Sequence, residues 1–449
     1  MNNTSASQMI EDYTQSTSKS RDYSVTAMNY IPGLTTRDLT FFEPYPPYLE
    51  RGKGCKVFDV DGNEWIDFFN NATSLILGHA HPAVVEAVQE RVAKGTAFHG
   101  PTPLEVEHAK GICERLESVE RLRFTNSGTE AGMFAVRAAR KYTGKNKVGK
   151  FEGGYHGTFD EALVSYHPDP AKAGPAEAPW SVTEPGVSKR AAEEVVVLPF
   201  NNSDAVEQIV KREKDDLACV IVEPMMGSAG IIPAKEGFLA DLRKITLEND
   251  VLLIFDEVQT FRHSWGGAQE VYNIRPDLTT LAKIIGGGFP VGAFGGKKEI
   301  MGIFDNSSGK ERISHGGTFN GNPITMTAGI TTLAQLTREV YVRLNNLGEQ
   351  LRTGLSDLFQ RYEYQARITG EASFFKIHYT NMEIWDYRSA VMADDKEEKT
   401  RLFFHLLNNG IFISRDTRGN LSTATGEAEI NNLMNVVEDY LKKRNNKSV

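Results

Sequence analysis

The sequence predicts an α/β protein with a large, mostly parallel sheet between helices and a smaller α+β domain. From about residue 104, short apolar segments alternate with segments of helical periodicity, as in a parallel sheet covered on both faces. Polar or glycine-rich residues follow most of these apolar segments, and open sheets bind ligands at the carboxyl ends of their strands. A chain of 449 residues also exceeds one usual compact domain, so we expect two.

The N-terminal part of the chain precedes this sheet. Residues 1–23 are rich in Ser, Thr, Asn and Gln and lack the apolar core of a signal peptide. We expect a partly disordered or helical lead-in that docks on a partner subunit. Apolar residues alternate with polar ones around Asp61-Gly62, which predicts a hairpin over 53–69. Residues 82–94 begin with proline and have helical spacing, so they should form a helix.

The sheet and its helices follow. The expected strands are 122–125, 147–151, 195–198, 218–222, 252–255 and 292–295. The expected helices between them include 129–142, 205–214 and 238–249. Residues 168–190 are rich in Pro, Ala and Gly and should form a long surface excursion.

The pattern changes after Pro323. One long helix is expected over 325–358, then a separate α+β unit from residue 362 that ends in a helix over 427–443. Residues 1–80 should therefore provide an N-terminal segment and a hairpin of the small domain, residues 81–330 the large ligand-binding domain, and residues 331–449 the rest of the small domain.

Composition excludes several classes of partner. A formal charge of −9 disfavours nucleic acid and anionic membranes, and no apolar run approaches the ~20 residues of a membrane span. The isolated cysteines 55, 113 and 219 fit a reducing cytoplasm. Histidines 79, 81, 99, 156 and 315 have no metal-ligand spacing, so no metal is expected.

An acid and a lysine mark the expected site. An apolar run ends in Asp256, and further along the chain Lys283 precedes the three glycines 286–288. A buried carboxylate needs a cationic partner, and a desolvated lysine is a nucleophilic amine. Pyridoxal phosphate needs both, a lysine for its Schiff base and an acid at its pyridinium nitrogen. The alternatives are a buried salt bridge for Asp256 and a surface position for Lys283.

Two segments are candidates for the phosphate. Ser127, Gly128 and Thr129 lie between a strand and a helix, where hydroxyls and backbone amides form an anion site. The alternative is an ordinary capping box with Glu130. Gly317-Thr318 lies in a second polar, glycine-rich segment, which is otherwise a loop and helix cap.

Four further residues are expected around the cofactor ring. Tyr155, beside His156 in a glycine-flanked loop, should stack on one ring face, and Val258 should pack on the other. The alternatives are a turn aromatic at the sheet edge for Tyr155 and plain core for Val258. Glu223 ends a strand and is expected to support the site rather than to transfer protons.

Together these segments resemble the class III aminotransferases, which are fold type I pyridoxal-phosphate enzymes. The segments 126–131, 154–157, 223–224, 256–258 and 280–283 occur in the family's order, and the resemblance runs from roughly residue 48 to 441. It implies that Lys283 is the Schiff-base lysine and Asp256 the partner of the ring nitrogen. It also implies phosphate contacts from residues 127–129, a ring held between Tyr155 and Val258, and an obligate homodimer in which Gly317-Thr318 comes from the other subunit.

Two branches of the family are most similar. The segments 78–82, 277–288 and 321–324 resemble glutamate-1-semialdehyde aminomutases, whereas 32–37, 123–126, 314–320 and 403–408 resemble β-amino acid transaminases that act on β-phenylalanine-type substrates. In the second branch, arginines matching Arg37 and Arg418 are candidate carboxylate binders, as the planar guanidinium suits. The alternatives are a surface residue for Arg37 and a turn residue for Arg418. Segment 414–420 departs from both branches because it also contains Arg415 and an acid, and aminomutases are more acidic and aromatic there.

These features predict a cytoplasmic, homodimeric aminotransferase with ping-pong chemistry. The expected donor is a β-amino acid and the expected acceptor a keto acid such as pyruvate or 2-oxoglutarate. The first alternative is intramolecular amino transfer of the glutamate-1-semialdehyde 2,1-aminomutase type. Racemisation or decarboxylation at the same lysine, and a catalytically silent relative, are the others.

Overall fold

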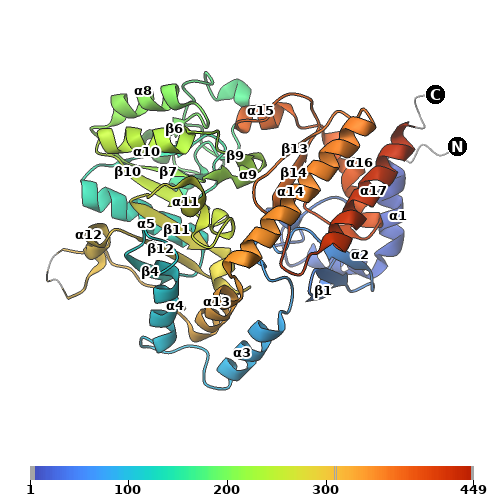
Figure 1. Cartoon of the computed structure of the whole chain (residues 1–449), viewed down its shortest axis with the longest axis horizontal. Coiled ribbons are helices and arrows are strands. Elements are labelled where there is room, and N and C mark those ends of the chain that lie inside the picture. The colour runs from blue at the N-terminus through green and yellow to red at the C-terminus, as the bar shows by residue number, and fades with distance from the viewer. Residues whose placement is uncertain (1–5, 308, 310, 446–449) are drawn as a thin grey trace. The chain divides into compact units, whose positions relative to one another are not determined.

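A seven-stranded sheet forms the centre of the larger of two compact units. The computed structural model describes residues 6–307, 309 and 311–445, and the larger unit takes residues 82–342 and 384–391 among them. The strand order is β4-β12-β11-β10-β7-β5-β6. Only β12 runs antiparallel to its neighbours, so the predicted mostly parallel sheet is confirmed (Figure 1). The strands are β4 (Arg121–Thr125), β5 (Lys147–Phe151), β6 (Val195–Leu198), β7 (Leu217–Val222), β10 (Leu252–Asp256), β11 (Leu278–Ala282) and β12 (Gly292–Gly296).

Helices flank this sheet. Helix α5 packs across β4, β7, β10, β11 and β12, while α10 packs on β10 and α8 on β6. The larger helices of the unit are α3 (Pro82–Val92), α4 (Pro103–Cys113), α5 (Gly128–Thr143), α8 (Ser203–Glu213), α10 (Phe238–Glu248) and α13 (Pro323–Gln335). The short elements are α6 (Asp160–Leu163), α7 (Lys189–Glu194), β8 (Met225–Met226), α9 (Gly227–Gly230), β9 (Ile232–Pro233), α11 (Gly267–Tyr272), α12 (Lys298–Met301) and α15 (Tyr387–Met392).

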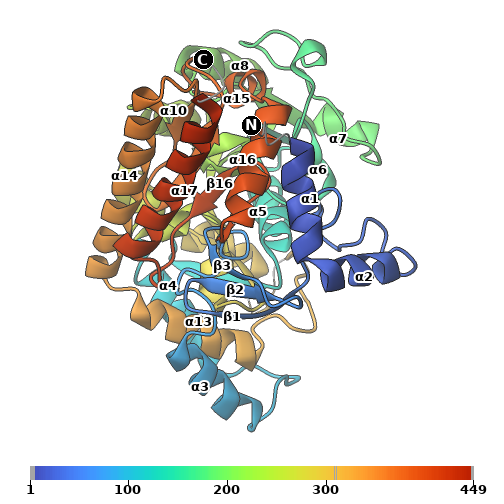
Figure 2. The same ribbon diagram turned by 90° about the vertical axis from the view of Figure 1, so that its right-hand side faces the viewer.

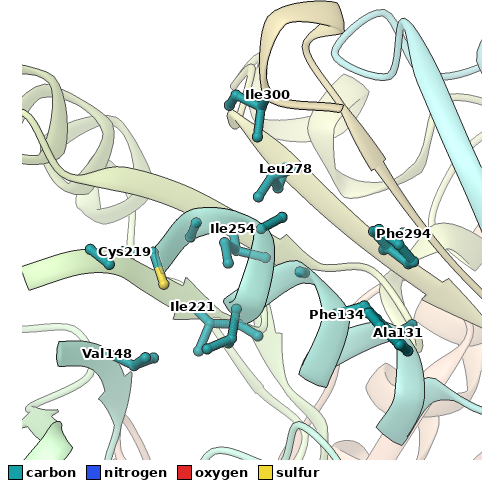
Figure 3. Close-up of a cluster of buried hydrophobic side chains, with 14 of the residues drawn as sticks. Ala131, Phe134, Val148, Cys219, Ile221, Ile254, Leu278, Phe294 and Ile300 are labelled. Atoms are coloured by element: carbon teal, nitrogen blue, oxygen red, sulfur yellow. The ribbon is translucent and has the colours of Figure 1, made fainter. Parts of the chain in front are cut away.

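The core beneath α5 fixes that helix on the sheet. Figure 3 shows Ala131 and Phe134 of the helix near Ile254, Leu278 and Phe294 of three strands. The Phe134 and Phe294 rings stack with centroids 5.6 Å apart. Because each fully buried side chain of this size contributes about 1.5–3 kcal/mol, the cluster holds the N-terminus of α5 firmly at the sheet edge.

The smaller unit draws on both ends of the chain. Strand β15 lies parallel to β3, with Ile411 paired to Ile66. Helices α1 and α16 lie side by side in both views (Figures 1 and 2). The sheets are β1-β2-β3-β15 and β13-β14-β16. The elements are α1 (Ala6–Ser16), α2 (Ser18–Ala27), β1 (Leu49–Lys53), β2 (Lys56–Asp59), β3 (Glu64–Asp67), β13 (Arg367–Thr369), β14 (Phe374–His378), α16 (Lys396–Asn408), β15 (Ile411–Phe412), β16 (Arg418–Asn420) and α17 (Glu427–Asn445).

The structure corrects two expectations about the elements. The single helix predicted over 325–358 is wrong: α13 ends at Gln335, and α14 (Arg338–Arg361) begins anew. The Arg115 guanidinium donates to the carbonyls of Leu333 and Leu336 at 2.5 and 3.2 Å, and so satisfies acceptors that a continuous helix would use. The expected strands also omitted β11, which immediately precedes Lys283.

The described part of the lead-in is helical, in α1 and α2. The excursion over 168–190 contains one 3-10 turn, Pro170–Lys172, before α7 begins. Among the helices of the described residues, none combines the length and hydropathy needed to span a bilayer.

Candidate active site

The carboxyl ends of neighbouring strands bring the predicted acid and lysine together. Asp256 is the last residue of β10 and pairs with Thr280 on β11, so Lys283 follows just beyond that pair. On the other side, Phe255 pairs with Val222 of β7, which places Glu223 beside Asp256. Three residues far apart in sequence therefore meet at one edge of the sheet.

Asp256 is buried and fully oriented. Its Oδ2 lies 2.8 Å from Nδ1 of His156, and its Oδ1 accepts the backbone N–H of Val258 at 3.0 Å. The sequence predicted His156 among the residues around the cofactor ring, and the structure makes it the partner of the acid. His156 Nε2 is buried with no hydrogen-bond partner among the described residues. The side-chain partner of Asp256 within the chain is thus an imidazole.

Lys283 lies in an uncommon backbone conformation. It begins the short turn Lys283–Gly286 after β11, with a φ of +52°. A non-glycine residue in the left-handed region costs on the order of 1–3 kcal/mol, and such residues cluster at functional sites. Ile284 and Ile285 are buried and anchor the turn. Lys283 itself is half-buried between β11 and these two residues.

The N-terminus of α5 has the predicted capping box. Ser127 Oγ accepts the N–H of Glu130 at 3.1 Å, and Glu130 Oε2 accepts the N–H of Asn126 at 2.6 Å. Within the residues the structure describes, the N–H groups of Gly128 and Thr129 donate no hydrogen bond. Both donors therefore stay open at the positive end of the helix, which is the condition for binding an anion.

The ends of β10, β11 and β12 pack against the N-terminus of α5. A Cβ added at Gly128 would lie 3.3 Å from Val258 Cγ2 and 3.4 Å from Ala282 Cβ. Val258 therefore lies against this helix terminus and is partly exposed rather than plain core. At Gly292, an added Cβ would lie 2.0 Å from the carbonyl oxygen of Ser127, so the close approach of β12 requires glycine there.

Glu223 organises the loop that contains Tyr155. Its Oε2 accepts the N–H of Tyr155 at 2.9 Å, and its Oε1 accepts the N–H of Gly227 at 3.1 Å. Burial raises the pKa of the Glu223 carboxyl, His156 opposes this, and Asp256 adds to it. Burial also raises the pKa of Tyr155, and the nearby carboxyl groups of Asp256 and Glu223 raise it further, so the phenol stays protonated. The Tyr155 ring lies 5.0 Å from that of Tyr166.

Gly317 and Thr318 do not reach the α5 terminus within this chain. Both are exposed, and among the residues that the structure describes no hydrogen bond joins Thr318 to residues 127–129. Neighbouring residues do link the two predicted phosphate segments: Asn126 Nδ2 donates to Asn320 Oδ1 at 2.8 Å.

The candidate substrate arginines belong to the smaller unit and differ in their surroundings. Arg418 lies in β16 with 12 % of its side chain exposed, and its Nε is 3.2 Å from Asp416. Lys376 approaches the same carboxylate at 3.3 Å. Burial raises the pKa of Asp416, but Arg418 and Lys376 outweigh this and hold that pKa well below its usual range. Arg415 is exposed and makes no hydrogen bond or ion pair with the described residues, whereas Arg37 donates to Asn71.

Sequence reasoning missed a clamp behind the Tyr155 loop. Arg388 donates from Nε and Nη2 to both oxygens of Glu152, at 2.7 and 2.9 Å. It also donates to the carbonyls of Gly174 at 2.8 Å and Ala173 at 3.1 Å. Glu152 begins the loop that leads to Tyr155, so Arg388 ties this loop to the excursion over 168–190. No sequence signal marks the pair, because 236 positions separate its members.

The residues at this edge fit pyridoxal phosphate. A buried carboxylate suits the ring nitrogen, two open backbone donors at α5 suit the phosphate, and an amine on a strained turn suits the aldehyde. The buried, unpartnered Nε2 of His156 leaves a polar position open next to Asp256. The ring nitrogen, the phosphate and the aldehyde of the cofactor therefore each have a matching group.

Comparisons with known proteins agree on one family. The model described as aminotransferase class-III matches residues 43–416. A glutamate-1-semialdehyde 2,1-aminomutase from Methanothermobacter thermautotrophicus is 44 % identical over 400 residues, which are 88 % of this chain and 91 % of that protein. An omega-transaminase from Sphaerobacter thermophilus is 42 % identical with a TM-score of 0.90, covering 94 % and 97 %. A β-phenylalanine aminotransferase from Variovorax paradoxus is 34 % identical with a TM-score of 0.89, covering 98 % and 97 %.

Proposed function

We propose that this chain, which belongs to the class III aminotransferases and uses pyridoxal phosphate, moves the amino group of a substrate that also bears a carboxylate. The observation that supports this best is the pairing of β10 with β11, because it sets Lys283 beside Asp256 at the sheet edge. When bound, pyridoxal phosphate supplies the electron sink that makes the proton next to the amino group removable.

In this proposal the chain's own residues divide the remaining work. Lys283 Nζ takes the proton from the substrate carbon that bears the amino group and passes it on, so that the amino group can leave that carbon. Asp256, oriented by His156, keeps a proton at the ring nitrogen. Tyr155 and Val258 exclude water from the two ring faces. Ser127, Gly128 and Thr129 bind the phosphate through the terminus of α5.

The proposal includes a homodimer in which Gly317 and Thr318 of one subunit complete the phosphate contacts of the other. The exposure of Thr318 supports this arrangement, as do the exposed Phe98, Phe289 and Phe319 of the same unit. Exposed aromatic side chains of this kind mark surfaces that bind a partner. We place the enzyme in the cytoplasm, as its cysteine usage favours.

The first candidate reaction is intramolecular amino transfer of the glutamate-1-semialdehyde 2,1-aminomutase type. The name of the 44 % identical relative supports it. This is the alternative that the sequence left open, and the relatives support it better than the β-amino acid donor that the sequence favoured.

Transamination of a β-amino acid is the second candidate. The observation that favours it is the 34 % identity to the β-phenylalanine aminotransferase. A guanidinium suits the carboxylate of either substrate, so both candidates need an arginine away from the cofactor.

One pair of assays separates the two candidates. Glutamate-1-semialdehyde is incubated with the holoenzyme without any keto acid, and β-phenylalanine is incubated with and without 2-oxoglutarate. Isomerised product without an acceptor supports the aminomutase, and acceptor-dependent turnover of β-phenylalanine supports the transaminase. If neither compound reacts, both substrate proposals fail, although the family assignment stands.

A further inference from the structure

A buried lysine lies beneath the acidic edge of the large sheet. Lys150 of β5 is only 1 % exposed, and it takes no part in the proposed amino transfer. It pairs with Ile221 of β7, which in turn pairs with Ile254 of β10. Side chains two residues apart along a strand share a face. The carboxylates of Glu223 and Asp256 therefore lie one step above Lys150, on the same face of the sheet.

Carboxylates from three segments offset the burial of Lys150. Burial lowers the pKa of its ammonium group to about 7, while Glu223, Glu184 and Glu152 raise it. Arg388 already pairs with Glu152, whereas the hydrogen-bond donors to Glu223 within the described residues are neutral groups. A buried ammonium group needs an opposite charge, so attraction to Glu223 directs Lys150 towards the strand ends.

A hydrogen bond ties Lys150 to the segment 164–166. Lys150 Nζ donates to the carbonyl of Val164 at 2.6 Å, and both residues are buried. The next residue, Ser165, is also buried and has a φ of +51°, a conformation that persists only where the surroundings impose it. Its carbonyl accepts the N–H of Gly153 at 2.9 Å, and its N–H donates to Val182 at 2.7 Å. The segment is therefore held between the cofactor loop and the excursion over 168–190.

The same segment supports the ring of Tyr155. Tyr166 directly follows Ser165, and its ring lies 5.0 Å from that of Tyr155 with an interplanar angle of 47°. The backbone of Tyr155 has a separate support, because its N–H donates to Glu223 at 2.9 Å. Lys150 thus acts on both supports of Tyr155: it bonds to the segment that ends in Tyr166, and it attracts Glu223.

We propose that Lys150 is a positioning residue for Tyr155. It holds the segment 164–166 against the Tyr155 ring and Glu223 against the Tyr155 backbone, so that the ring is placed to stack on pyridoxal phosphate. This inference rests on the proposed function, in which Tyr155 covers one face of the cofactor ring.

Two lysine variants of the same strand test the inference. Lys150→Met keeps an unbranched apolar stem but removes the ammonium group. The probe is pyridoxal phosphate itself, with its dissociation constant and the circular dichroism of the bound cofactor measured on the full chain. We expect about 10-fold weaker binding, as the loss of one charged hydrogen bond predicts, and a changed cofactor signal. Lys147→Met is the control: Lys147 begins β5, away from the site, and pairs with Glu213, so both readouts should keep their wild-type values.

Tyr166→Leu tests the last link without altering a buried charge. Tyr166 is partly exposed, so the variant should fold. Loss of the ring contact should weaken cofactor binding by about 3-fold and change the cofactor signal in the same direction. Wild-type values in both Lys150→Met and Tyr166→Leu would overturn the inference. If Lys150→Met does not fold, wild-type values in Tyr166→Leu alone overturn it.

Tyr155→Leu separates failure of this inference from failure of the proposed function. If Tyr155→Leu alone keeps the wild-type dissociation constant, Tyr155 does not cover the ring and that part of the proposed function is wrong. If it weakens binding about 10-fold while Lys150→Met does not, only the role of Lys150 is wrong.

The double variant tests the route. Because Lys150 acts through Tyr155, adding Lys150→Met to Tyr155→Leu should weaken binding by less than a further factor of about 2. A full further loss of about 10-fold would overturn the inference, since Lys150 would then act on the cofactor by another route.

Discussion

The edge of the large sheet and the arginine segments of the smaller unit are built in opposite ways. At the sheet edge, Asp256 and Glu223 are buried and accept hydrogen bonds that come from other strands and loops. In the smaller unit, Arg37 and Arg415 are exposed. Sheet topology therefore fixes the groups that we assign to cofactor chemistry, whereas the exposed arginines that we propose for substrate choice depend little on it.

The largest expected effect is at the sheet edge. Asp256→Asn keeps the size and the hydrogen bond from Val258 but removes the charge, so kcat should fall about 1000-fold. Steady-state kinetics measure this. As a matched control, Asp241→Asn alters an exposed acid of α10 and should leave kcat unchanged. A loss of less than tenfold in Asp256→Asn would mean that the topology does not define the chemical centre.

The next largest expected effect is on stability, and it distinguishes the two arginines of segment 414–420. Arg418→Ala removes one of two cations from the half-buried Asp416, so the free energy of unfolding should fall by about 2 kcal/mol. Arg415→Ala should change it by less than about 0.5 kcal/mol, because Arg415 is exposed. Chemical denaturation of both variants measures the difference. Equal losses would contradict the separation of a structural arginine from one available to substrate.

A pH dependence of the free energy of unfolding, of similar size, is expected from the larger unit. His108 is buried on α4, and its Nε2 lies 2.7 Å from the carbonyl of Ile285, near Lys283. Burial lowers the pKa of His108 to about 4, with a smaller raising effect from that carbonyl. Unfolding restores the ordinary pKa of 6.5. The stability of the fold with a neutral, buried His108 imidazole is therefore complete above pH 6.5, and part of it is lost as the pH falls towards 4.

The expected loss is about 3 kcal/mol of unfolding free energy. Denaturant titrations at several pH values measure it, with His108→Gln as the control because glutamine can donate to Ile285 without titrating. An equal pH dependence in the wild type and His108→Gln would contradict this role for His108.

The smallest expected effect tests the clamp behind the Tyr155 loop. Arg388→Lys keeps a positive charge but cannot span Glu152 and the carbonyls of residues 173–174. We expect about tenfold weaker binding of pyridoxal phosphate and faster proteolysis within 168–190. Fluorescence titration and limited digestion measure these two quantities. Unchanged values for both would show that the clamp does not support the cofactor loop.

Sequence reasoning succeeded where function follows a strand end. The apolar runs before Glu223 and Asp256 predicted their strands, and parallel pairing then brings the ends together. It failed where a contact depends on non-neighbouring elements. The pair of His156 and Asp256 joins the loop after β5 to the end of β10, across β7, and Arg115 reaches the end of α13 from another helix region. For the arginines, no periodicity distinguishes a side chain held by Asp416 from one that is open to solvent.

The most direct test of the account follows the absorbance of bound pyridoxal phosphate after the holoenzyme is mixed with an amino donor alone. The wild-type spectrum should shift rapidly as the amino group moves to the cofactor, with either glutamate-1-semialdehyde or β-phenylalanine. Lys283→Ala should be slower by at least about 1000-fold, because the amine that moves the proton is gone. A Lys283→Ala enzyme that shifts at the wild-type rate would contradict the account.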